Sequence, residues 1–303
     1  MQIHIQGSHL RKADRDVRVC YNPIMNSVPG SRLFRKQIAI PQDHGSWIFI
    51  LTPLIIGVAA GKVFTQATLG LCTAAVCVFL LRQPVTTLVK VYSGRRPSTD
   101  LTAAYFWAIG YGLLALAALA DIFSLGDGYI VYLAVPGIPV FAWHLWLVSR
   151  RAERRQAGIE VIAAGVLSLA APAAYWIGVG HYDPFGWWLW LLSWLQTAAS
   201  ILYAYLRLEQ REWNSAPSRL ERFRAGMRAL AFSSFNLILS AILGQAAGLL
   251  PHLIFIPFLL QWLETLWGID RPAVKWKPVR IGIRLMAVGV LWTGLFIICW
   301  ARG

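Results

Sequence analysis

Three ionisable residues near the ends of long apolar segments could perform acid–base chemistry. Asp43 and His44 stand directly before an apolar run that reaches residue 61, and Glu160 lies near the start of another. An imidazole titrates close to neutral pH, so His44 is a candidate general acid or base that either carboxylate could orient. A lone histidine at a helix start can equally serve only as a hydrogen-bonded cap. The sequence therefore makes Asp43, His44 and Glu160 catalytic candidates and leaves both roles open.

A second group of polar residues has the chemistry of an anion-binding site. An arginine side chain can hold a phosphate through two parallel hydrogen bonds, and acidic partners can keep such arginines in place. The candidates, which stand at the ends of apolar segments or in the connections beside them, are Arg82, Gln83, Arg95, Arg96, Arg207, Glu264 and Arg284. Because both charge signs are present, these side chains could instead only neutralise one another. The spacing of Cys, His, Asp and Glu matches no metal-binding motif, so we expect no metal.

The segments that must position these residues are too apolar for a soluble protein. Hydrophobic residues make up 57% of the 303-residue chain and charged residues 14%, whereas soluble domains carry about 25% charged residues. The sequence therefore predicts an all-α polytopic membrane protein, whose helices need roughly 17–25 residues each to cross the hydrocarbon core. Nine stretches qualify or nearly qualify: 45–61, 67–81, 101–120, 129–148, 159–180, 185–206, 227–248, 249–267 and 281–301.

Basic residues alternate between the two sides of this predicted nine-helix bundle. Successive connections on one side hold seven, four, four, five and four Lys or Arg, and those on the other side hold one, none, none, none and one. Basic loops remain in the cytoplasm, so we expect the N-terminus inside and the C-terminus outside a bacterial inner membrane or a thylakoid-type membrane. Because the net charge of +14 is spread through these loops, topology accounts for it, and we expect no nucleic-acid partner.

With this topology, the membrane-embedded ionisable residues gather at the cytoplasmic side. A charge inside the hydrocarbon core is costly unless it is paired or lines a polar cavity. We therefore predict a polar cavity that opens to the cytoplasm and is capped by the basic connections 82–100 and 207–224. An anionic head group with an apolar tail, such as a lipid phosphate or a prenyl diphosphate, suits such a cavity. Residues 1–40 form a basic polar extension that we expect to be flexible, and residues 41–303 form a single transmembrane domain.

Four separated motifs resemble those of the YwiC-like family of bacterial membrane proteins. They are PQDHGSW at 41–47, LRQP at 81–84, RRAERRQAGIEVIAAGVLSLAAPAAYWIGVG at 150–180 and IPFLLQWLETLWGIDRP at 256–272. The resemblance spreads over most of residues 41–303, and the acidic-His-Gly-x-Trp pattern of the family is matched from Asp43 to Trp47. Because no function is established for that family, the resemblance implies a kind of membrane protein rather than an activity.

More distantly, the chain resembles the UbiA superfamily of intramembrane prenyltransferases. The shared features are nine helices, an inside N-terminus and a basic stretch before the fifth helix. The active site of that superfamily opens to the cytoplasm beneath the loops after helices two and six, where this chain has its two basic connections. Those enzymes hold magnesium with aspartate-rich motifs in both loops, whereas the first connection here has only Asp100. The resemblance therefore implies at best a divergent prenyltransferase-like enzyme without the usual magnesium site.

Two other classes of function remain open. The basic N-terminal arm could dock the protein as an accessory or assembly subunit of a respiratory or photosynthetic complex. The proline-containing runs 136–139 and 256–258 could be discontinuous helices of a small-molecule transporter, although no inverted repeat is visible. His44 and His144 share the predicted inner side, but two histidines at a common level are weak evidence for haem. The sequence identifies neither the ligand, a cofactor, the pathway nor the oligomeric state.

Overall fold

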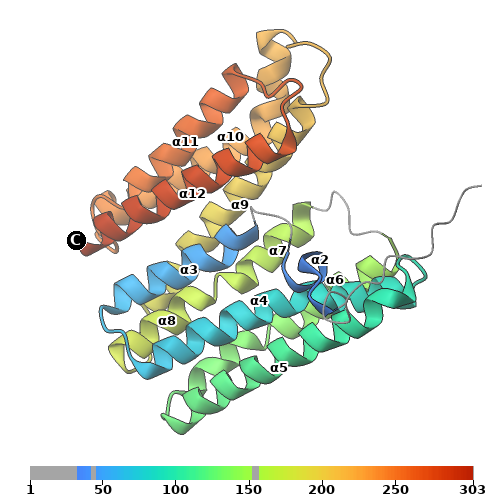
Figure 1. Cartoon of the computed structure of the whole chain (residues 1–303). Coiled ribbons are helices and arrows are strands. Elements are labelled where there is room, and N and C mark those ends of the chain that lie inside the picture. Colours follow the sequence, from blue (N-terminus) through green and yellow to red (C-terminus); the bar gives the residue numbers. More distant parts are fainter. Residues whose placement is uncertain (1–32, 42–45, 152–156, 303) are drawn as a thin grey trace, which may run out of the picture.

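The structure of the protein is a bundle of helices. The computed structural model describes residues 33–41, 46–151 and 157–302, and these residues contain helices and no β-strand (Figure 1). In chain order the α-helices are α2 (Lys36–Ala39), α3 (Ser46–Gly61), α4 (Gln66–Tyr92), α5 (Leu101–Ser124), α6 (Gly137–Ser149), α7 (Ala157–Leu167), α8 (Ala170–Val179), α9 (Gly186–Gln210), α10 (Arg219–Ala241), α11 (Phe255–Asp270) and α12 (Pro278–Ala301). The shorter elements are the 3₁₀ segments η1 (Ser98–Asp100) and η2 (Gly128–Ala134) and the π-helical turn η3 (Ile242–Ala246). The all-α prediction is confirmed for this part of the chain.

Seven helical stretches of the described chain are long and apolar enough to cross a membrane. They are residues 66–92, 98–124, 128–149, 157–179, 186–210, 219–246 and 278–301. The α3 helix is also apolar, but its 16 residues give a length of about 24 Å, which is shorter than a usual span. The α11 helix has 16 residues as well. Each of the nine predicted stretches overlaps a helix, and seven of them have the length of a full span.

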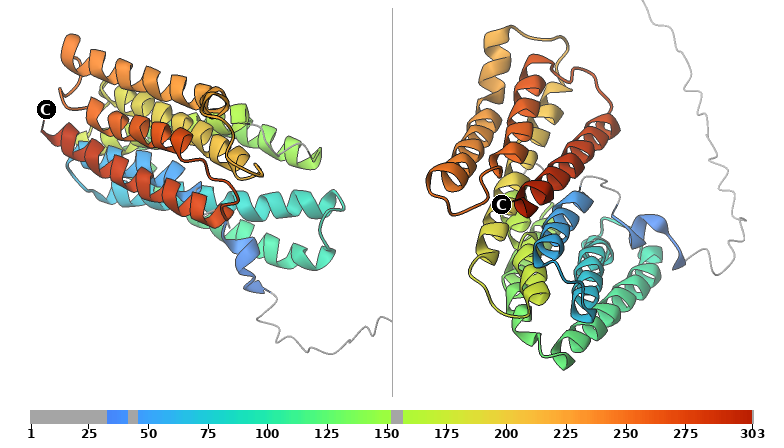
Figure 2. Two further views of the ribbon diagram at one scale, coloured as in Figure 1. Left: turned by 90° about the horizontal axis from the view of Figure 1, so that it is seen from above. Right: turned by 90° about the vertical axis from the view of Figure 1, so that its left-hand side faces the viewer.

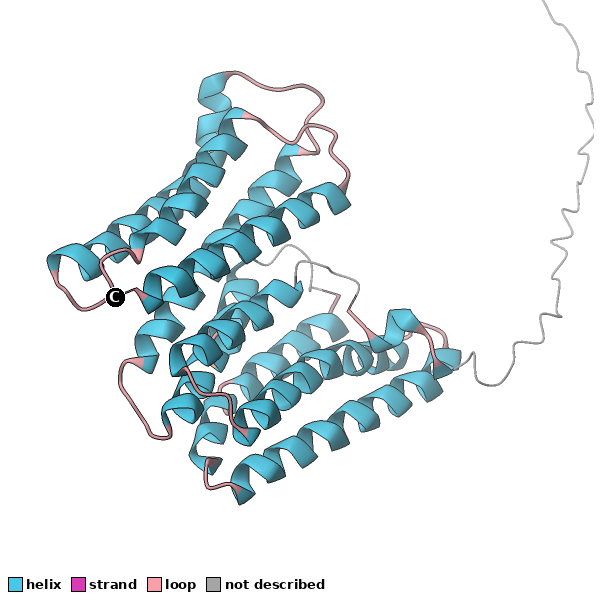
Figure 3. Ribbon diagram, turned by 60° about the vertical axis from the view of Figure 1, so that its left-hand side comes forward, coloured by secondary structure: helices cyan, strands magenta, loops and turns pink. Residues whose placement is uncertain are grey.

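The bundle consists of an N-terminal half, α2 to α8, and a C-terminal half, α9 to α12. The two halves meet where α3 packs against both α8 and α12 and where α9 contacts α7 and α8. The right-hand view of Figure 2 shows both halves side by side, and Figure 3 shows that the loops lie at the ends of the helices. The connections from α4 to α5, from α9 to α10 and from α11 to α12 lie at one end, on the right in Figure 1. Most of the basic connections therefore share that end of the bundle.

Glycines bring α3 unusually close to α8. A Cβ atom added at Gly57 would lie 2.2 Å from the carbonyl oxygen of Ala171, and one added at Gly178 would lie 2.7 Å from the Cα of Gly61. Any larger side chain at these positions would collide with backbone. Small residues allow the same close approach between other membrane helices.

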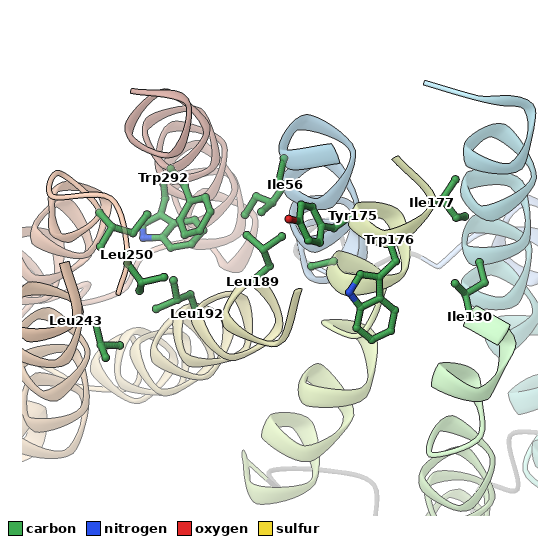
Figure 4. Close-up of a cluster of buried hydrophobic side chains, with 14 of the residues drawn as sticks. Ile56, Ile130, Tyr175, Trp176, Ile177, Leu189, Leu192, Leu243, Leu250 and Trp292 are labelled. Carbon is green, nitrogen blue, oxygen red and sulfur yellow. The ribbon is translucent and has the colours of Figure 1, made fainter. Parts of the chain in front are cut away.

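The main hydrophobic core lies where the two halves meet. Figure 4 shows part of it, with Ile56 from α3, Tyr175 and Trp176 from α8, Leu189 from α9 and Trp292 from α12. In a bilayer the surrounding lipid is as apolar as the core, so close packing and its dispersion energy favour helix association more than water exclusion does. The close packing of large side chains in this core therefore joins the two halves.

The α4 helix is longer than the sequence predicts. It continues to Tyr92, so the predicted end at residue 81 is wrong, and Arg82 and Gln83 lie inside the helix instead of at its end. Pro84 also lies inside it. Extensive packing of α4 along α5 stabilises the helix despite the missing proline N–H. The predicted cap 82–100 is thereby reduced to a short connection before η1.

The predicted boundary between the seventh and eighth stretches lies within the observed turn, but the eighth helix begins later than predicted. The α10 helix ends at Ala241, and the turn that follows η3 includes Gly248 with a left-handed φ of 61°. Glycine adopts this conformation without steric cost, so the chain reverses here. Pro251, predicted in the first turn of the next helix, lies before it in a turn, where its carbonyl accepts a hydrogen bond from the N–H of Ile254 at 3.0 Å. The α11 helix therefore begins only at Phe255.

The interruptions of the helices differ from those that the proline runs suggest. The fifth predicted stretch divides into α7 and α8 at Ser168. Pro172 lacks the N–H that would bond the Ser168 carbonyl in a continuous helix, and the N–H of Ala171 bonds that carbonyl at 3.0 Å instead. The run 136–139 joins η2 to α6, whereas the run 256–258 lies within α11 and interrupts nothing.

Residues 33–41, the described end of the basic extension, pack against the bundle. Arg35 forms an ion pair with the buried carboxylate of Asp100. The indole N–H of Trp107 donates a hydrogen bond to the carbonyl of Leu33 at 3.0 Å. These contacts hold the segment that contains α2 against α4 and α5.

Candidate functional site

A partly buried ion pair joins α11 to α12 at the end of the bundle that carries the basic connections. Nε and Nη2 of Arg284 donate to the two carboxylate oxygens of Glu264 at 2.6 and 2.7 Å. The Glu264 side chain is 8% exposed and that of Arg284 is 36% exposed. Two parallel charge-assisted hydrogen bonds make this a strong and directional contact. The sequence predicts both residues as site candidates, and the structure brings them together.

Tyr203 links a third helix, α9, to this ion pair through a hydrogen bond. Its hydroxyl donates to Oε1 of Glu264 at 2.8 Å. The ring passes against Gly268 of α11, where an added Cβ would lie 2.3 Å from the tyrosine oxygen. Glycine at that position therefore gives Tyr203 the space that it needs to reach the carboxylate.

Arg207 lies one turn further along α9 and is 1% exposed. Its Nη1 donates to the carbonyls of Gly268 and Arg271, each at 2.8 Å. Its guanidinium carbon lies 5.3 Å from the ring centre of Trp267 and 4.9 Å from that of Trp276. The last carbonyls of a helix have no partner within the helix, and a cation there also interacts favourably with the helix dipole. Arg207 is thus engaged with the end of α11, although the sequence predicts it as a phosphate ligand.

A recess of about 420 Å³ opens beside the ion pair on the first turns of α12. Its lining consists of the cations Lys277, Arg280 and Arg284, together with Trp276, Val279, Ile283 and Ala287. The Arg280 guanidinium lies 4.0 Å from the Trp276 ring centre, and that of Arg284 lies 3.5 Å from the Trp267 ring centre. Cation–π stacking orients a guanidinium group while its edge can still donate hydrogen bonds. The recess therefore combines oriented positive charge with an apolar wall.

The other predicted anion-binding residues lie in the N-terminal half. Arg82 and Gln83 project from α4, and Nε2 of Gln83 donates to the carbonyl of Gln37 in α2 at 2.9 Å. Nη1 of Arg95 donates to the carbonyl of Val148 at the end of α6, at 2.5 Å. Gln83 and Arg95 thereby connect α4 and the residues after it to α2 and α6.

Arg96 belongs to the same half of the molecule. It pairs with Asp100 at 3.3 Å, and Asp100 also pairs with Arg35. The polar residues that the sequence places at a single depth thus form two groups on different helices. One group surrounds α4, and the other joins α9, α11 and α12.

Of the acid–base candidates, Glu160 lies within the described residues. It is exposed at the start of α7, and its Oε1 accepts a hydrogen bond from the hydroxyl of Tyr205 at 2.8 Å. Asp43 and His44 lie outside the described residues. His144 lies on α6. Because His44 is outside the described residues, the structure does not test the suggested haem pair of these two histidines.

Reasoning from the sequence missed Tyr203, Trp276, Lys277 and Arg280. The basic residues were counted only as signals of topology, so it was missed that Arg280 and Arg284, four positions apart, share one face of a helix. The sequence signal that could have indicated this site is the pair Trp276 and Lys277 directly before α12. Across the described residues, no group of three or more His, Cys, Asp or Glu side chains is placed to hold a metal ion.

At the opposite end of the bundle, Asp183 organises the turn between α8 and α9. The N–H of Phe185 donates to its Oδ1 at 2.8 Å, and the hydroxyl of Tyr175 donates to its Oδ2 at 2.7 Å. These hydrogen bonds, the one from the backbone first, lower the pKa of the Asp183 carboxyl from its ordinary value. This carboxylate therefore stabilises a turn by capping nearby donors.

The seven long apolar helices define a multi-pass helical membrane protein, and its C-terminal half carries a basic recess. Residues 40–175 match the model of the family described as YwiC-like protein. The resemblance to this family that the motifs predict is thereby confirmed for that region. The match ends within α8, so the recess and the ion pair lie beyond the matched residues.

One relative gives the same indication. The chain is 27% identical to "Uncharacterized protein YwiC" of Bacillus subtilis (strain 168) over 176 residues, which are 57% of this chain and 68% of that protein. No solved structure matches the chain. The comparisons therefore support a kind of membrane protein and leave its activity to be argued from the site.

Proposed function

We propose that this membrane protein binds an anionic, phosphate-bearing amphiphile in the recess at the start of α12. The observation that carries the proposal is the presence of Lys277, Arg280 and Arg284 beside an exposed apolar wall. Among the described residues, Arg284 has a carboxylate partner, whereas Lys277 and Arg280 have none. An arginine binds a phosphate through two hydrogen bonds, and a lysine adds a point charge. Lys277 and Arg280 are therefore the proposed ligands of the phosphate.

The apolar wall gives the proposed position of the tail. Val279, Ile283 and Ala287 are four residues apart, so they lie on one face of α12 and run from the basic end toward the middle of the helix. Val279 is 65% exposed and Ile283 is 54% exposed. An acyl or prenyl chain along this face would have its phosphate at the level of Arg280. A soluble anion would gain nothing from such a wall, so the recess favours an amphiphile.

The proposal uses a topology of nine crossings with a cytoplasmic N-terminus. In this topology α3 and α11 are the two short crossings, which a bilayer accommodates by thinning locally. The alternation of basic connections supports it, because each basic connection then lies inside. The recess would lie at the head-group level of the inner leaflet, where anionic lipids concentrate.

A prenyl diphosphate is included among the ligands because of the distant resemblance to the UbiA superfamily. It shares its phosphate chemistry with a phospholipid and differs in its tail. Lys277 and Arg280 would then offset charge that magnesium offsets in that superfamily. We propose binding by these cations, and the mass of the bound molecule distinguishes the two kinds of ligand.

Native mass spectrometry of the full chain, purified in mild detergent, tests this proposal. We expect the protein to retain a phosphate-bearing lipid or a prenyl diphosphate, and Arg280→Gln to lower its occupancy about tenfold, the effect of losing one charge-assisted contact. Lys275→Gln is the matched control, because Lys275 is exposed in the same connection and does not line the recess. Equal retention in Arg280→Gln and Lys275→Gln, or retention of neutral lipids alone, would refute the proposal.

A further inference from the structure

A line of buried polar side chains runs along α9 from the recess toward the middle of the C-terminal half. We call it the polar seam, and its members are Ser193, Gln196, Tyr203 and Arg207 of α9 with Gln261 and Glu264 of α11. Each of these residues is at most 8% exposed. Their spacing of mostly three or four residues places them on the facing sides of the two helices. The seam reaches the recess where Glu264 binds Arg284.

Several polar atoms of the seam have no hydrogen-bond partner among the described residues. Nε2 of Gln196 donates to Oε1 of Gln261 at 2.9 Å, which leaves Oε1 of Gln196 and Nε2 of Gln261 unpaired. Oγ of Ser193 and Nη2 of Arg207 are unpaired as well. An unpaired polar group is costly inside a membrane protein, where buried groups are normally satisfied by protein or by ordered water.

Two more unpaired atoms border the seam. Nδ2 of Asn236 donates to the carbonyl of Leu195 at 2.8 Å, whereas its Oδ1 has no partner in the described part of the chain. The same holds for Nε1 of Trp292, whose fully buried ring belongs to the hydrophobic core of Figure 4. The Trp292 ring packs edge-on against Phe258 with 5.3 Å between ring centres. Phe258 lies one turn before Gln261 on α11, so these aromatic rings are placed next to the inner end of the seam.

We infer that the polar seam holds a chain of ordered water molecules, which connects the recess at Arg284 to the indole nitrogen of Trp292. A water molecule both donates and accepts, which is what the unpaired oxygen of Gln196 and the unpaired N–H of Gln261 require. Arg284 and Trp292 are eight residues apart on α12, so the path measures about 12 Å, the length of roughly four waters. The inference concerns the interior of the bundle and holds whatever ligand the recess binds.

Hydrogen–deuterium exchange of indole N–H groups tests the inference in the full chain. The protein would carry ¹⁵N-labelled tryptophan in lipid nanodiscs, and the Trp292 signal would be assigned by its loss in Trp292→Phe. After transfer to D₂O, we expect Trp292 to exchange at least about tenfold faster than Trp190. The indole of Trp190 donates to the carbonyl of Gly165 at 2.9 Å, away from the seam. Protection of Trp292 equal to that of Trp190 would overturn the inference.

A variant that dries the seam sharpens the test. In Gln196→Leu/Gln261→Leu both partners of one hydrogen bond are replaced together, which avoids a new unpaired group, and we expect the exchange of Trp292 to slow about tenfold. Thr87→Val is the control, because Thr87 is buried in α4 and its hydroxyl donates to the carbonyl of Gln83 at 3.0 Å. An exchange rate that the double variant leaves unchanged would contradict the water path. Should that variant fail to fold, the comparison within the native protein still decides.

Discussion

Each half of the bundle is held together internally by a different kind of contact. In the N-terminal half, α3 meets α8 through Gly57 and Gly61, which bring the backbones into direct contact. In the C-terminal half, α9, α11 and α12 meet through the hydrogen-bonded side chains of Tyr203, Glu264 and Arg284. Close backbone packing requires that the residues at the contact have no large side chain. Charge-assisted hydrogen bonds require that both the donor and the acceptor side chain are present. The first half should therefore be sensitive to added atoms and the second to removed ones.

The difference also explains where the molecule keeps its buried polar groups. In the most apolar part of α9, 56% of the residues are buried, whereas in that of the stretch Ser98–Ser124, which contains α5, only 17% are. A polar side chain on the best-shielded helix can find partners on several neighbours, which lowers the cost of placing it within a membrane. The C-terminal half therefore combines a polar interior with the candidate site, and the N-terminal half supplies tight apolar packing.

The largest expected effect is that of added volume in the N-terminal half. Gly57→Ala should lower the free energy of unfolding by about 3 kcal/mol, because the new Cβ meets the Ala171 carbonyl and the backbone must shift. Gly110→Ala is the control, since nothing lies within 4 Å of a Cβ there and alanine favours a helix. Thermal unfolding in detergent would compare them, and a Gly57→Ala protein as stable as Gly110→Ala would break the comparison.

Loss of a buried charge in the C-terminal half should have the next largest effect. Glu264→Met leaves Arg284 without its carboxylate and should cost about 2 kcal/mol, a value reduced for the partial exposure of Arg284. The double variant Glu264→Met/Arg284→Met removes both charges and should be more stable than Glu264→Met alone. The same unfolding experiment measures both. A double variant less stable than the single one would contradict a role for charge pairing.

The smallest expected effect is a dependence of stability on pH at the turn between α8 and α9. The pKa of Asp183 is lowered in the folded protein, first by the N–H of Phe185 and then by Tyr175. Its contribution to stability is therefore present above the unfolded pKa, about 3.9, and is lost as pH falls through the lower folded value. Between pH 5 and pH 3 the melting temperature of the native protein should fall by about 1 °C more than that of Asp183→Asn. Equal slopes for the two proteins would show that Asp183 contributes nothing.

The positions of the helices could be predicted from apolar runs, whereas several of their ends could not. Residues after Pro84 are more polar, and the packing of α4 against its neighbours, α5 above all, stabilises them as helix to Tyr92. Likewise, α9 extends past Leu206 because Arg207 and Gln210 bond to the end of α11. Tertiary contacts of this kind have no local signature in the sequence.

The candidate site was predictable in part for a similar reason. Opposite charges at one depth indicated that Glu264 and Arg284 could pair, and the structure pairs them. Depth, however, says nothing about which helices are neighbours, so Arg82 and Arg96 were grouped with residues of the other half. Arg280 was overlooked because a basic residue before a membrane helix is usually a topological signal.

Photocrosslinking on α12 tests the central claim, selection of an anionic lipid by the recess, most directly. A photoreactive amino acid would replace Ile283 in the recess or Ile298 near the other end of the helix, two positions that are 54% and 49% exposed. In nanodiscs of mixed anionic and zwitterionic lipids, the account predicts that crosslinks at 283 are enriched in anionic lipid and that those at 298 follow the bulk composition. Adducts of the same composition at both positions would contradict it.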